Sequence, residues 1–270
     1  MNIPFFSDQF LFEETAIFWF GEVKPIDNYS DVRIGYTDEE LFVHVAIYDR
    51  LLWYDVYSLG DNFEEWDAVT LYLDVDGNVG IAPSARTYRF VGQLSRWVER
   101  NNYQVAYQGN GSGWTKVELS FTSEAGHRGN PNDSSRDSGW RITYHIPFTS
   151  LGLSGPPTKG DKWGLGVAVH DRDDANDTPI TDKQWPTGMK SLQSRTWGQL
   201  AFGLPDDSPS PSQAQGSVTI RQGLNGVNVV DGEVGGHTNC GQGLDRFYEW
   251  GDANYAYIDR INIQNQYDVA

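Results

Sequence analysis

Cysteine, methionine and histidine are scarce in this chain, whose 270 residues include one cysteine (Cys240), two methionines and five histidines. A single cysteine excludes an intrachain disulfide and a metal site built from several thiolates. The chain also lacks any apolar run near the roughly 18–20 residues that a membrane-spanning helix needs. It contains no G-x-S-x-G, H-E-x-x-H or phosphate-loop pattern, so the common hydrolase, zinc-protease and nucleotide-binding motifs have no support.

Basic residues are also few: 20 Lys and Arg residues stand against 37 Asp and Glu residues, which gives a formal net charge of −17 at pH 7. Nucleic acids and anionic membrane surfaces are bound by clustered cations, so this balance argues against both as partners. It is compatible with a neutral ligand, with Ca²⁺ and with an extracellular location. The 13 Phe, 10 Trp and 14 Tyr residues can bury a sizeable core, so we expect a folded chain.

The strongest pattern in the sequence is an alternation of apolar and polar residues with a period of two. This period is typical of half-buried β-strands, and turn signals rich in Asp, Asn and Gly separate the alternating runs. We predict an all-β fold, an antiparallel β-sandwich of immunoglobulin-like or jelly-roll type, with no long amphipathic helix. The main runs are Leu41–Ile47, Val69–Leu73, Trp140–Ile146 and Trp163–Val169, with shorter ones at 32–36, 87–91, 117–121 and 197–202.

Two polar stretches interrupt this pattern and indicate how the chain is organised. Residues 124–139 predict a mobile hairpin loop, and the proline-containing residues 204–216 predict a linker. The sandwich domain is therefore expected at residues 1–203. Residues 217–270 are rich in Gly, Asn and Asp and suggest short β pieces, so we expect a partial β domain or strands that dock on the first domain.

Five segments resemble, in the same order, the sequence blocks of family 9 carbohydrate-binding modules. The first contains an aspartate turn followed by Leu-Phe-Val, and the others match the family's D-S-V-E, G-W-x-x-E-x-x-I-P-F, W-G-F-N and W-G-x-L strands. The segments are Arg33–Ala46, Trp66–Asp74, Gly139–Phe148, Trp163–Asp171 and Trp197–Leu200. The resemblance covers about residues 16–203 and implies a DOMON-like β-sandwich, a group whose members bind sugars or haem. The tail at 217–270 more distantly resembles the opening of DNRLRE-type β domains.

The same resemblance implies a sugar site with two stacking tryptophans and a strand arginine. Trp185 stands where the family's second tryptophan falls, and Trp66 lies about two positions from the place of the first. Glu65, which precedes Trp66, is included in the predicted ligand-binding set. Arg89 matches an arginine that the family points at sugar hydroxyls, and the alternation places it on the strand face opposite its aromatic neighbours.

Two residues depart from the family pattern on the expected binding face. Thr70 replaces an acid, and Ala168 replaces a polar residue. The alternative to a sugar site is that the two tryptophans are packing residues and that Arg89 is a solvated strand residue.

Two acidic loops could hold a cation. The first begins like a calcium loop, with alternating oxygen ligands and a glycine, but its twelfth position is Ala85, so it is not an EF-hand. The second belongs to the acidic run at 170–177. The sequence predicts a structural Ca²⁺ ion, and the alternative is that both loops are turns whose side chains bond the local backbone. The candidate ligands are Asp74, Asp76, Asn78, Asp171 and Asp173.

We expect a non-catalytic carbohydrate-binding module of a multidomain bacterial protein. The expected partners are an oligo- or polysaccharide and other domains of the same protein, at an extracellular or cell-surface location although no signal peptide is present in this sequence. Adjacent acids such as Glu64 and Glu65 would point apart on a strand, which does not favour a glycosidase. One alternative is a haem-binding electron-transfer domain with Met189 and His170 as axial ligands, although a core contact explains Met189 more simply. The other is a cell-surface interaction domain without a small ligand.

Overall fold

The computed structural model describes residues 1–7, 10–24, 27–57, 62–77, 79–174, 176 and 180–204, and the strand residues 218–224, 227–228 and 258–265. The chain divides into two compact units. The first comprises Met1–Gly21 and Asn28–Pro205, and the second comprises Glu22–Asp27 and Asp206–Ala270.

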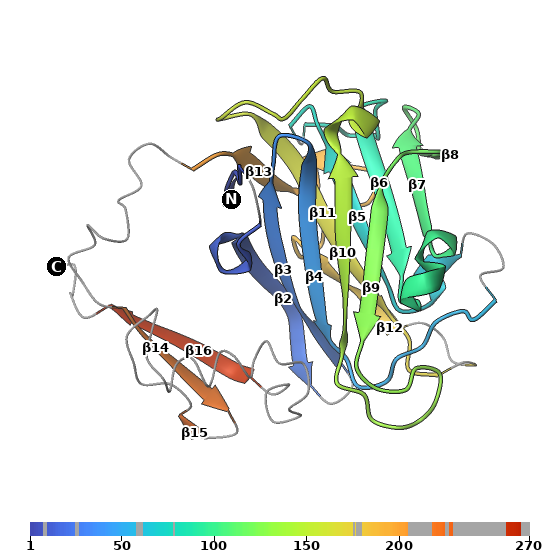
Figure 1. Cartoon of the computed structure of the whole chain (residues 1–270), viewed down its shortest axis with the longest axis vertical. Helices are drawn as coiled ribbons and strands as arrows, with labels where there is room; N and C mark the ends of the chain where they lie inside the picture. Colours follow the sequence, from blue (N-terminus) through green and yellow to red (C-terminus); the bar gives the residue numbers. More distant parts are fainter. Residues whose placement is uncertain are drawn as a thin grey trace. The chain divides into compact units, whose positions relative to one another are not determined.

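The first unit contains a large, mostly antiparallel sheet (Figure 1). In spatial order its strands are β1, β13, β11, β5, β6, β7 and β8. Strand β12 also pairs with β11, beyond the end of β13. Among the strand pairs described in this sheet, only β1 and β13 run parallel. The bounds are β1 Asn2–Ile3, β13 Gly198–Phe202, β11 Lys162–Asp171, β12 Ile180–Trp185, β5 Ala68–Asp74, β6 Thr87–Gln93, β7 Gln104–Gly109 and β8 Trp114–Val117.

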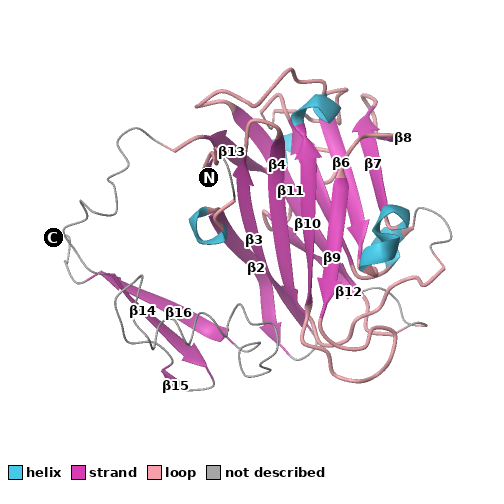
Figure 2. Ribbon diagram, in the orientation of Figure 1, coloured by secondary structure: helices cyan, strands magenta, loops and turns pink. Residues whose placement is uncertain are grey.

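A second sheet packs against the first, and in Figure 2 its strands lie in front of those of the first sheet. Its order is β2, β3, β4, β10 and β9, with bounds β2 Ala16–Lys24, β3 Asp27–Tyr36, β4 Glu40–Tyr48, β10 Trp140–Pro147 and β9 Thr122–His127. The helices among the described residues are short 3₁₀ turns, namely η1 Phe12–Glu14, η2 Phe63–Glu65, η3 Trp97–Asn102, η4 Phe148–Leu151 and η5 Ser194–Thr196. None of the described helices has the length and apolar character needed to cross a membrane.

The core lies between the two sheets because each strand turns its apolar residues to the same side. Val43 and Val45 of β4 and Leu71 and Leu73 of β5 are fully buried in one cluster that draws on both sheets. Tyr144 reaches across this core, and its hydroxyl donates a hydrogen bond to the carbonyl of Val69 at 2.6 Å. The predicted all-β sandwich is therefore confirmed.

The polar stretch at 124–139 differs in part from its prediction as a loop. Its first residues belong to β9, which pairs with β10 from Thr122 to His127. The remainder is tied to the turn after β4, because Asp137 Oδ2 accepts a hydrogen bond from the Leu52 amide at 3.0 Å and Asn132 Oδ1 accepts one from the Tyr54 amide at 2.8 Å.

The second unit contains a three-stranded antiparallel sheet. Its order is β15, β14 and β16, with bounds β14 Val218–Leu224, β15 Val227–Asn228 and β16 Ile258–Asn265. The linker predicted at 204–216 lies outside the described residues except for Leu204, so the division at residue 203 stays a prediction.

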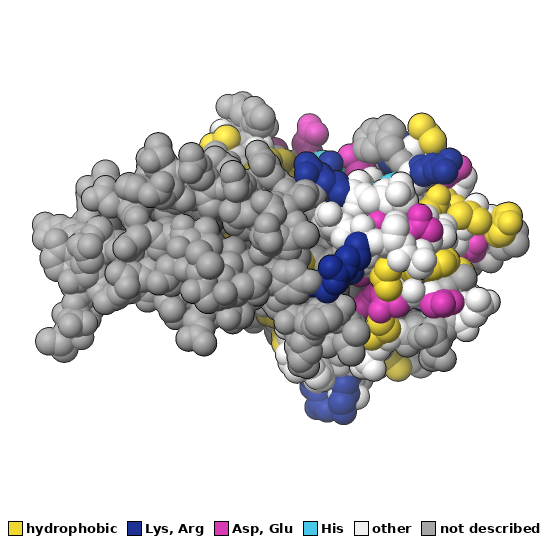
Figure 3. All heavy atoms as spheres, turned by 90° about the horizontal axis from the view of Figure 1, so that it is seen from below, with side chains coloured by type: hydrophobic (Ala, Val, Ile, Leu, Met, Phe, Trp, Pro, Cys, Tyr) yellow, Lys and Arg dark blue, Asp and Glu magenta, His cyan; other side chains and the backbone are white. Residues whose placement is uncertain are grey.

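Charged and apolar side chains are interspersed on the face of the first unit that Figure 3 shows. Basic side chains do not gather into one continuous patch on the described part of this face, in keeping with the strongly acidic composition.

Candidate functional site

A pocket of about 660 Å³ opens on the face of the first sheet that points away from the core. We call it the outer pocket. On β5 the aliphatic residues face the core, so the alternation turns Thr70 and Tyr72 outward. The register pairs Tyr72 with Arg89 of β6, and pairs Thr70 with Ala168 of β11, which in turn pairs with Gln184 of β12. The lining residues are Glu64, Tyr72, Arg89, His170, Asp182, Gln184 and residues 189–193.

A chain of hydrogen bonds joins four polar side chains at this pocket. The hydroxyl of Thr70 lies 2.7 Å from Glu64 Oε1 and 2.8 Å from His170 Nε2, and His170 Nδ1 lies 2.9 Å from Asp182 Oδ1. Thr70 has a single hydroxyl hydrogen, so when it donates to Glu64 it must accept from His170.

Arg89 is held at the pocket by one ring and one carboxylate. Its guanidinium carbon lies 4.0 Å from the centre of the Tyr107 ring, and Nη2 lies 3.5 Å from Glu64 Oε2. Among the described residues, Nε has no hydrogen-bond partner. A guanidinium held in this way can offer its remaining N–H groups to a ligand that supplies hydrogen-bond acceptors.

An apolar cluster adjoins the polar residues. Tyr72, Ala168, Met189 and Trp197 are buried together on this face, and the half-buried Trp114 packs against them. The ring centres of Tyr72 and Trp197 are 5.4 Å apart. Burial, together with the Glu64 carboxylate, raises the pKa of Tyr72 above its usual value, so its hydroxyl stays a neutral hydrogen-bond donor.

The two residues considered as haem ligands both line this pocket, but they do not fit that role. A Cβ atom at Gly166 would lie only 2.6 Å from the Met189 sulfur, which shows how closely the thioether packs onto the sheet. Both nitrogens of His170 are already within hydrogen-bond distance of Thr70 and Asp182. An axial ligand needs an accessible lone pair, and neither side chain presents one here.

Of the predicted ligand-binding residues, Arg89 lines the outer pocket and the other three lie elsewhere. Trp66 follows η2, and the Arg172 guanidinium carbon sits 4.4 Å above its ring. Glu65 is exposed, and its backbone carbonyl accepts a hydrogen bond from Arg172 Nη1 at 2.9 Å.

Trp185 projects from the opposite face of β12. It pairs with Val167, a core residue, whereas Gln184 pairs with the outward-facing Ala168. Its ring stacks on Phe18, with the ring centres 4.0 Å apart and an interplanar angle of 30°.

The pocket residues that sequence reasoning missed share one property. Glu64, Tyr72, Asp182 and Gln184 come from four different positions along the chain, and only the sheet register brings them together. The alternation places Tyr72 on the same strand face as Thr70, and this pattern could have identified Tyr72 as a residue of the binding face.

Beyond the ends of β4 and β11, three carboxylates converge. One oxygen from each of Asp49, Asp171 and Asp173 lies within 4.8 Å of the other two, and we call this group the acidic cluster. Asp49 and Asp171 are buried, with exposed fractions of 7% and 2%. Asp49 Oδ1 accepts a hydrogen bond from the Leu51 amide at 3.2 Å, whereas Asp49 Oδ2 is buried without a partner among the described residues.

Asp67 lies beside this cluster and is fully buried. Its two oxygens accept hydrogen bonds from the Trp53 amide at 2.7 Å and the Arg172 amide at 3.0 Å. Burial and the neighbouring carboxylates raise the pKa values of Asp49 and Asp67 well above the ordinary range. Such crowding of acids is the environment in which a bound cation would be stabilising.

The two predicted metal loops have different surroundings. Asp171 and Asp173 belong to the acidic cluster, together with Asp49, which sequence reasoning missed because it follows β4, far from these residues in the sequence. In the other loop Asp74 Oδ1 accepts a hydrogen bond from the Asp76 amide at 3.0 Å, as in an Asx turn. Asp76 also pairs with Arg86 at 3.3 Å, and Asn78 lies outside the described residues.

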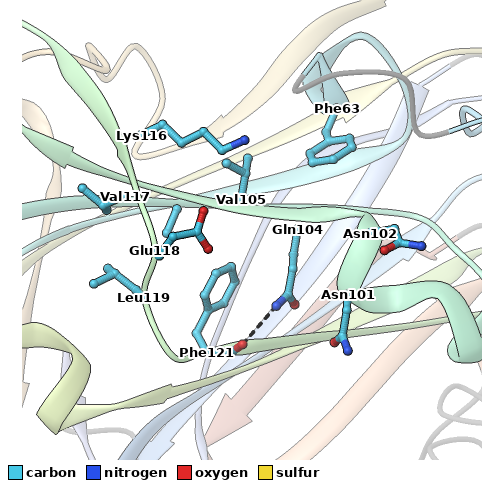
Figure 4. A pocket seen from close by; sticks show the side chains of 11 residues that line it. Phe63, Asn101, Asn102, Gln104, Val105, Lys116, Val117, Glu118, Leu119 and Phe121 are labelled. Atoms are coloured by element: carbon cyan, nitrogen blue, oxygen red, sulfur yellow. Dashed lines mark hydrogen bonds between the residues drawn. The ribbon is translucent and has the colours of Figure 1, made fainter.

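A second pocket of about 410 Å³ lies at the edge of the first sheet (Figure 4). Phe63, Val105 and Phe121 supply apolar surface, and Gln104 Nε2 donates a hydrogen bond to the Phe121 carbonyl at 3.0 Å. None of the predicted ligand-binding residues lines it.

No protein-family model matches the chain, and no curated protein matches it. Solved structures do match. Two of them show a family 9 carbohydrate-binding module from Caldicellulosiruptor kristjanssonii, one in complex with cellotriose (16% identity, TM-score 0.52) and one in complex with glucose (15% identity, TM-score 0.53). Each match covers 78% of this chain, and 98% and 99% of those chains respectively.

A third solved structure comes from Bacteroides uniformis and is named as a candidate carbohydrate-binding protein. It matches with 14% identity and a TM-score of 0.54, covering 75% of this chain and 98% of that one. At these identities the likeness establishes the fold: the chain contains the β-sandwich seen in family 9 carbohydrate-binding modules. The resemblance of the tail to DNRLRE-type domains has no support in these comparisons.

Proposed function

We propose that the outer pocket binds carbohydrate without catalysis. The observation that carries the proposal is Arg89, whose guanidinium carbon lies over the Tyr107 ring beside Glu64, so that a donor and an acceptor stand together in a pocket of about 660 Å³. Sugar hydroxyls need both kinds of group, fixed in orientation. The match of the fold to modules solved with cellotriose and glucose supports the same conclusion.

The charges of the pocket favour a neutral ligand. Glu64 and Asp182 are balanced by Arg89 and Lys190, and both carboxylates already have partners in the hydrogen-bond chain. A polyhydroxylated ligand can exchange hydrogen bonds with such a surface and bring no charge that must be compensated. The proposal includes an extracellular or cell-surface location and attachment to other domains. The stacking roles of Trp66 and Trp185 stay predictions, because neither ring lines this pocket.

A glycan array followed by isothermal titration calorimetry tests the proposal. We expect binding of a neutral oligosaccharide, and Arg89→Met should weaken it by about tenfold or more, because a hydrogen bond to a charged group contributes about 1.5–3 kcal/mol. Arg86→Met is the matched control, since Arg86 pairs with Asp76 outside the pocket. Equal affinity for both variants, or no sugar bound by the parent, would reject the proposal.

We propose in addition that the acidic cluster holds a structural calcium ion. The supporting observation is that carboxylate oxygens of Asp49, Asp171 and Asp173 approach within 4.8 Å in buried surroundings. Calcium prefers such oxygen ligands, and its charge would offset the mutual repulsion of the carboxylates.

Differential scanning calorimetry tests the calcium proposal. Added CaCl₂ should raise Tm and EDTA should lower it, because an ion that binds only the native state stabilises that state. The shift should disappear in Asp49→Asn and persist in Asp74→Asn, whose side chain bonds its own turn. An equal melting temperature with CaCl₂ and with EDTA in the parent protein would rule out the ion.

A further inference from the structure

The acidic cluster and the outer pocket share one chain segment, and a second segment of the pocket adjoins the cluster. His170, which lines the pocket, is followed directly by Asp171 of the acidic cluster at the end of β11. Glu64, which also lines the pocket, lies three residues before Asp67, whose buried carboxylate adjoins the cluster. A displacement of residues 170–173 therefore moves a residue of both sites, and a displacement of residues 64–67 moves a pocket residue together with a carboxylate that adjoins the cluster.

Arg172 joins these two segments. Its amide donates to Asp67 Oδ1 at 3.0 Å, and its Nη1 donates to the Glu65 carbonyl at 2.9 Å. Its guanidinium also lies 4.4 Å from the centre of the Trp66 ring. The residue that follows Asp171 thus holds the η2 turn from which Glu64 projects.

A second contact between the two segments is made by Thr70. Thr70 lies between the two segments and contacts both, with its hydroxyl 2.7 Å from Glu64 and 2.8 Å from His170. The relative position of Glu64 and His170 is therefore set by the buried Thr70 hydroxyl, which contacts both, and by the Arg172–Asp67 contact on the side of the cluster.

Whether the acidic cluster holds a cation affects the positions of these two segments. Asp49 Oδ2 is buried and has no partner among the described residues, and Asp49 lies on a segment separate from Asp171 and Asp173. Ionised carboxylates at this separation repel each other strongly where water is largely excluded. A divalent cation between them would attract each carboxylate and so hold residues 171–173 against Asp49.

We infer that a divalent cation at Asp49, Asp171 and Asp173 strengthens carbohydrate binding in the outer pocket by fixing the segments that carry His170 and Glu64. This inference rests on the proposed function of the pocket. Coupling between sites is reciprocal, so the sugar must raise the affinity for the cation by the same factor. Coupling of this kind is typically between about 5-fold and 150-fold, and we expect an effect at the lower end of that range.

Calorimetric titration with cellotriose, in CaCl₂ and in EDTA, tests the coupling on the full chain. The parent protein should bind cellotriose about fivefold more tightly in CaCl₂. Asp49→Asn should show the weaker affinity under both conditions, because Asp49 belongs to the cluster but does not line the pocket. Asp133→Asn, which removes an exposed carboxylate from a loop turn, should behave like the parent.

A second readout needs no sugar. The imidazole NMR signals of His170 and the side-chain Nε–H signal of Arg89 should shift when CaCl₂ is added to the parent, and not when it is added to Asp49→Asn. His170 is adjacent in sequence to Asp171 of the cluster, so its signal alone would not show a change across the pocket. Arg89 is the more distant probe, and it contacts Glu64 at 3.5 Å.

The outcomes separate the two proposals. If cellotriose binds equally in CaCl₂ and EDTA while calcium raises Tm, the coupling is rejected and the carbohydrate site stands. If the Arg89 signal shifts with calcium but no sugar binds, the cluster and the pocket are structurally linked, but the carbohydrate function fails and with it the inferred effect on sugar affinity. If calcium changes neither Tm nor the NMR signals, the cation site and the coupling are both rejected. Should Asp49→Asn fail to fold, the parent in CaCl₂ and EDTA still decides.

Discussion

Arg89 illustrates how one charged side chain can be prepared for a ligand. Its guanidinium carbon lies 4.0 Å from the centre of the Tyr107 ring, and Glu64 Oε2 lies 3.5 Å from Nη2. Less rotational freedom then has to be lost when a ligand binds, which is the general advantage of preorganised sites. Lysine would not replace this arginine, because an ammonium group has neither the planar face nor the fork of donors.

Trp185 and Gln184 are neighbours in sequence with opposite surroundings. Trp185 stacks on Phe18, and a Cβ atom at Gly198 would lie within 2.4 Å of the indole carbon Cζ3. Trp185→Ala should therefore lower the free energy of unfolding by about 3 kcal/mol and leave sugar affinity unchanged. Urea unfolding and calorimetric titration measure the two effects.

The matched control for Trp185→Ala is Gln184→Ala. This change should weaken sugar binding and leave the free energy of unfolding nearly unchanged, because Gln184 lines the outer pocket on the other face of β12. If Trp185→Ala instead binds sugar more weakly at unchanged stability, the predicted stacking role is correct.

At the scale of elements, local patterns predicted the main strands, while the sites depended on how strands pair. The short run at 117–121 was wrong as a strand, because it lies between the end of β8, at Val117, and the start of β9. The runs Leu41–Ile47 and Trp163–Val169 fall within β4 and β11 because a period of two needs only neighbouring residues. The orientation of Arg89 followed from the same rule. The convergence of Asp49 with Asp171 could not be predicted, because it depends on which strands end side by side.

The pairing of β4 with β10 places on one sheet two histidines whose pKa values are shifted in opposite directions. Burial first, and then the charges of Arg141 and Arg33, lower the pKa of His44 to about 3, and its Nδ1 lies 2.9 Å from the Thr143 hydroxyl. The hydrogen bond to Glu40 raises the pKa of His145.

The lowered pKa of His44 makes the sandwich sensitive to acid. Between about pH 6.5 and pH 3 the unfolded chain binds a proton at this position and the folded chain does not, so stability falls as the pH falls through that window. The slope from one such group is at most about 1.4 kcal/mol per pH unit. His44→Gln should reduce the loss of stability between pH 7 and pH 4.5, measured by urea unfolding.

His145→Gln serves as the opposing control. The raised pKa of His145 contributes stability that is present below its unfolded pKa and is lost as the pH rises through its folded value. Its removal should therefore steepen, not reduce, the loss of stability on acidification. A pH profile of His44→Gln that is parallel to the parent profile would contradict the assignment of acid sensitivity to this residue.

At the scale of the whole molecule, the first unit contains every described residue of the outer pocket and of the acidic cluster. Its last strand, β13, is tied in on both sides: β11 pairs with it, and so does β1 in parallel orientation, with the Gly203 amide donating to the Ile3 carbonyl at 2.9 Å. These contacts reach as far as Gly203, which is consistent with the predicted end of the sandwich domain.

Ending the chain after Gly203 should therefore leave a cooperatively folding protein with unchanged carbohydrate binding. Phe202, the last core side chain of β13, is fully buried and is retained, and the pocket-lining residues all precede residue 194. Thermal unfolding should give a single transition close to the corresponding transition of the full chain, and calorimetric titration should give the same affinity for cellotriose. A truncated chain that aggregates or loses the sugar would show that residues 204–270 belong to the functional domain, because burial and hydrogen bonding within the first unit alone would then not suffice to stabilise it.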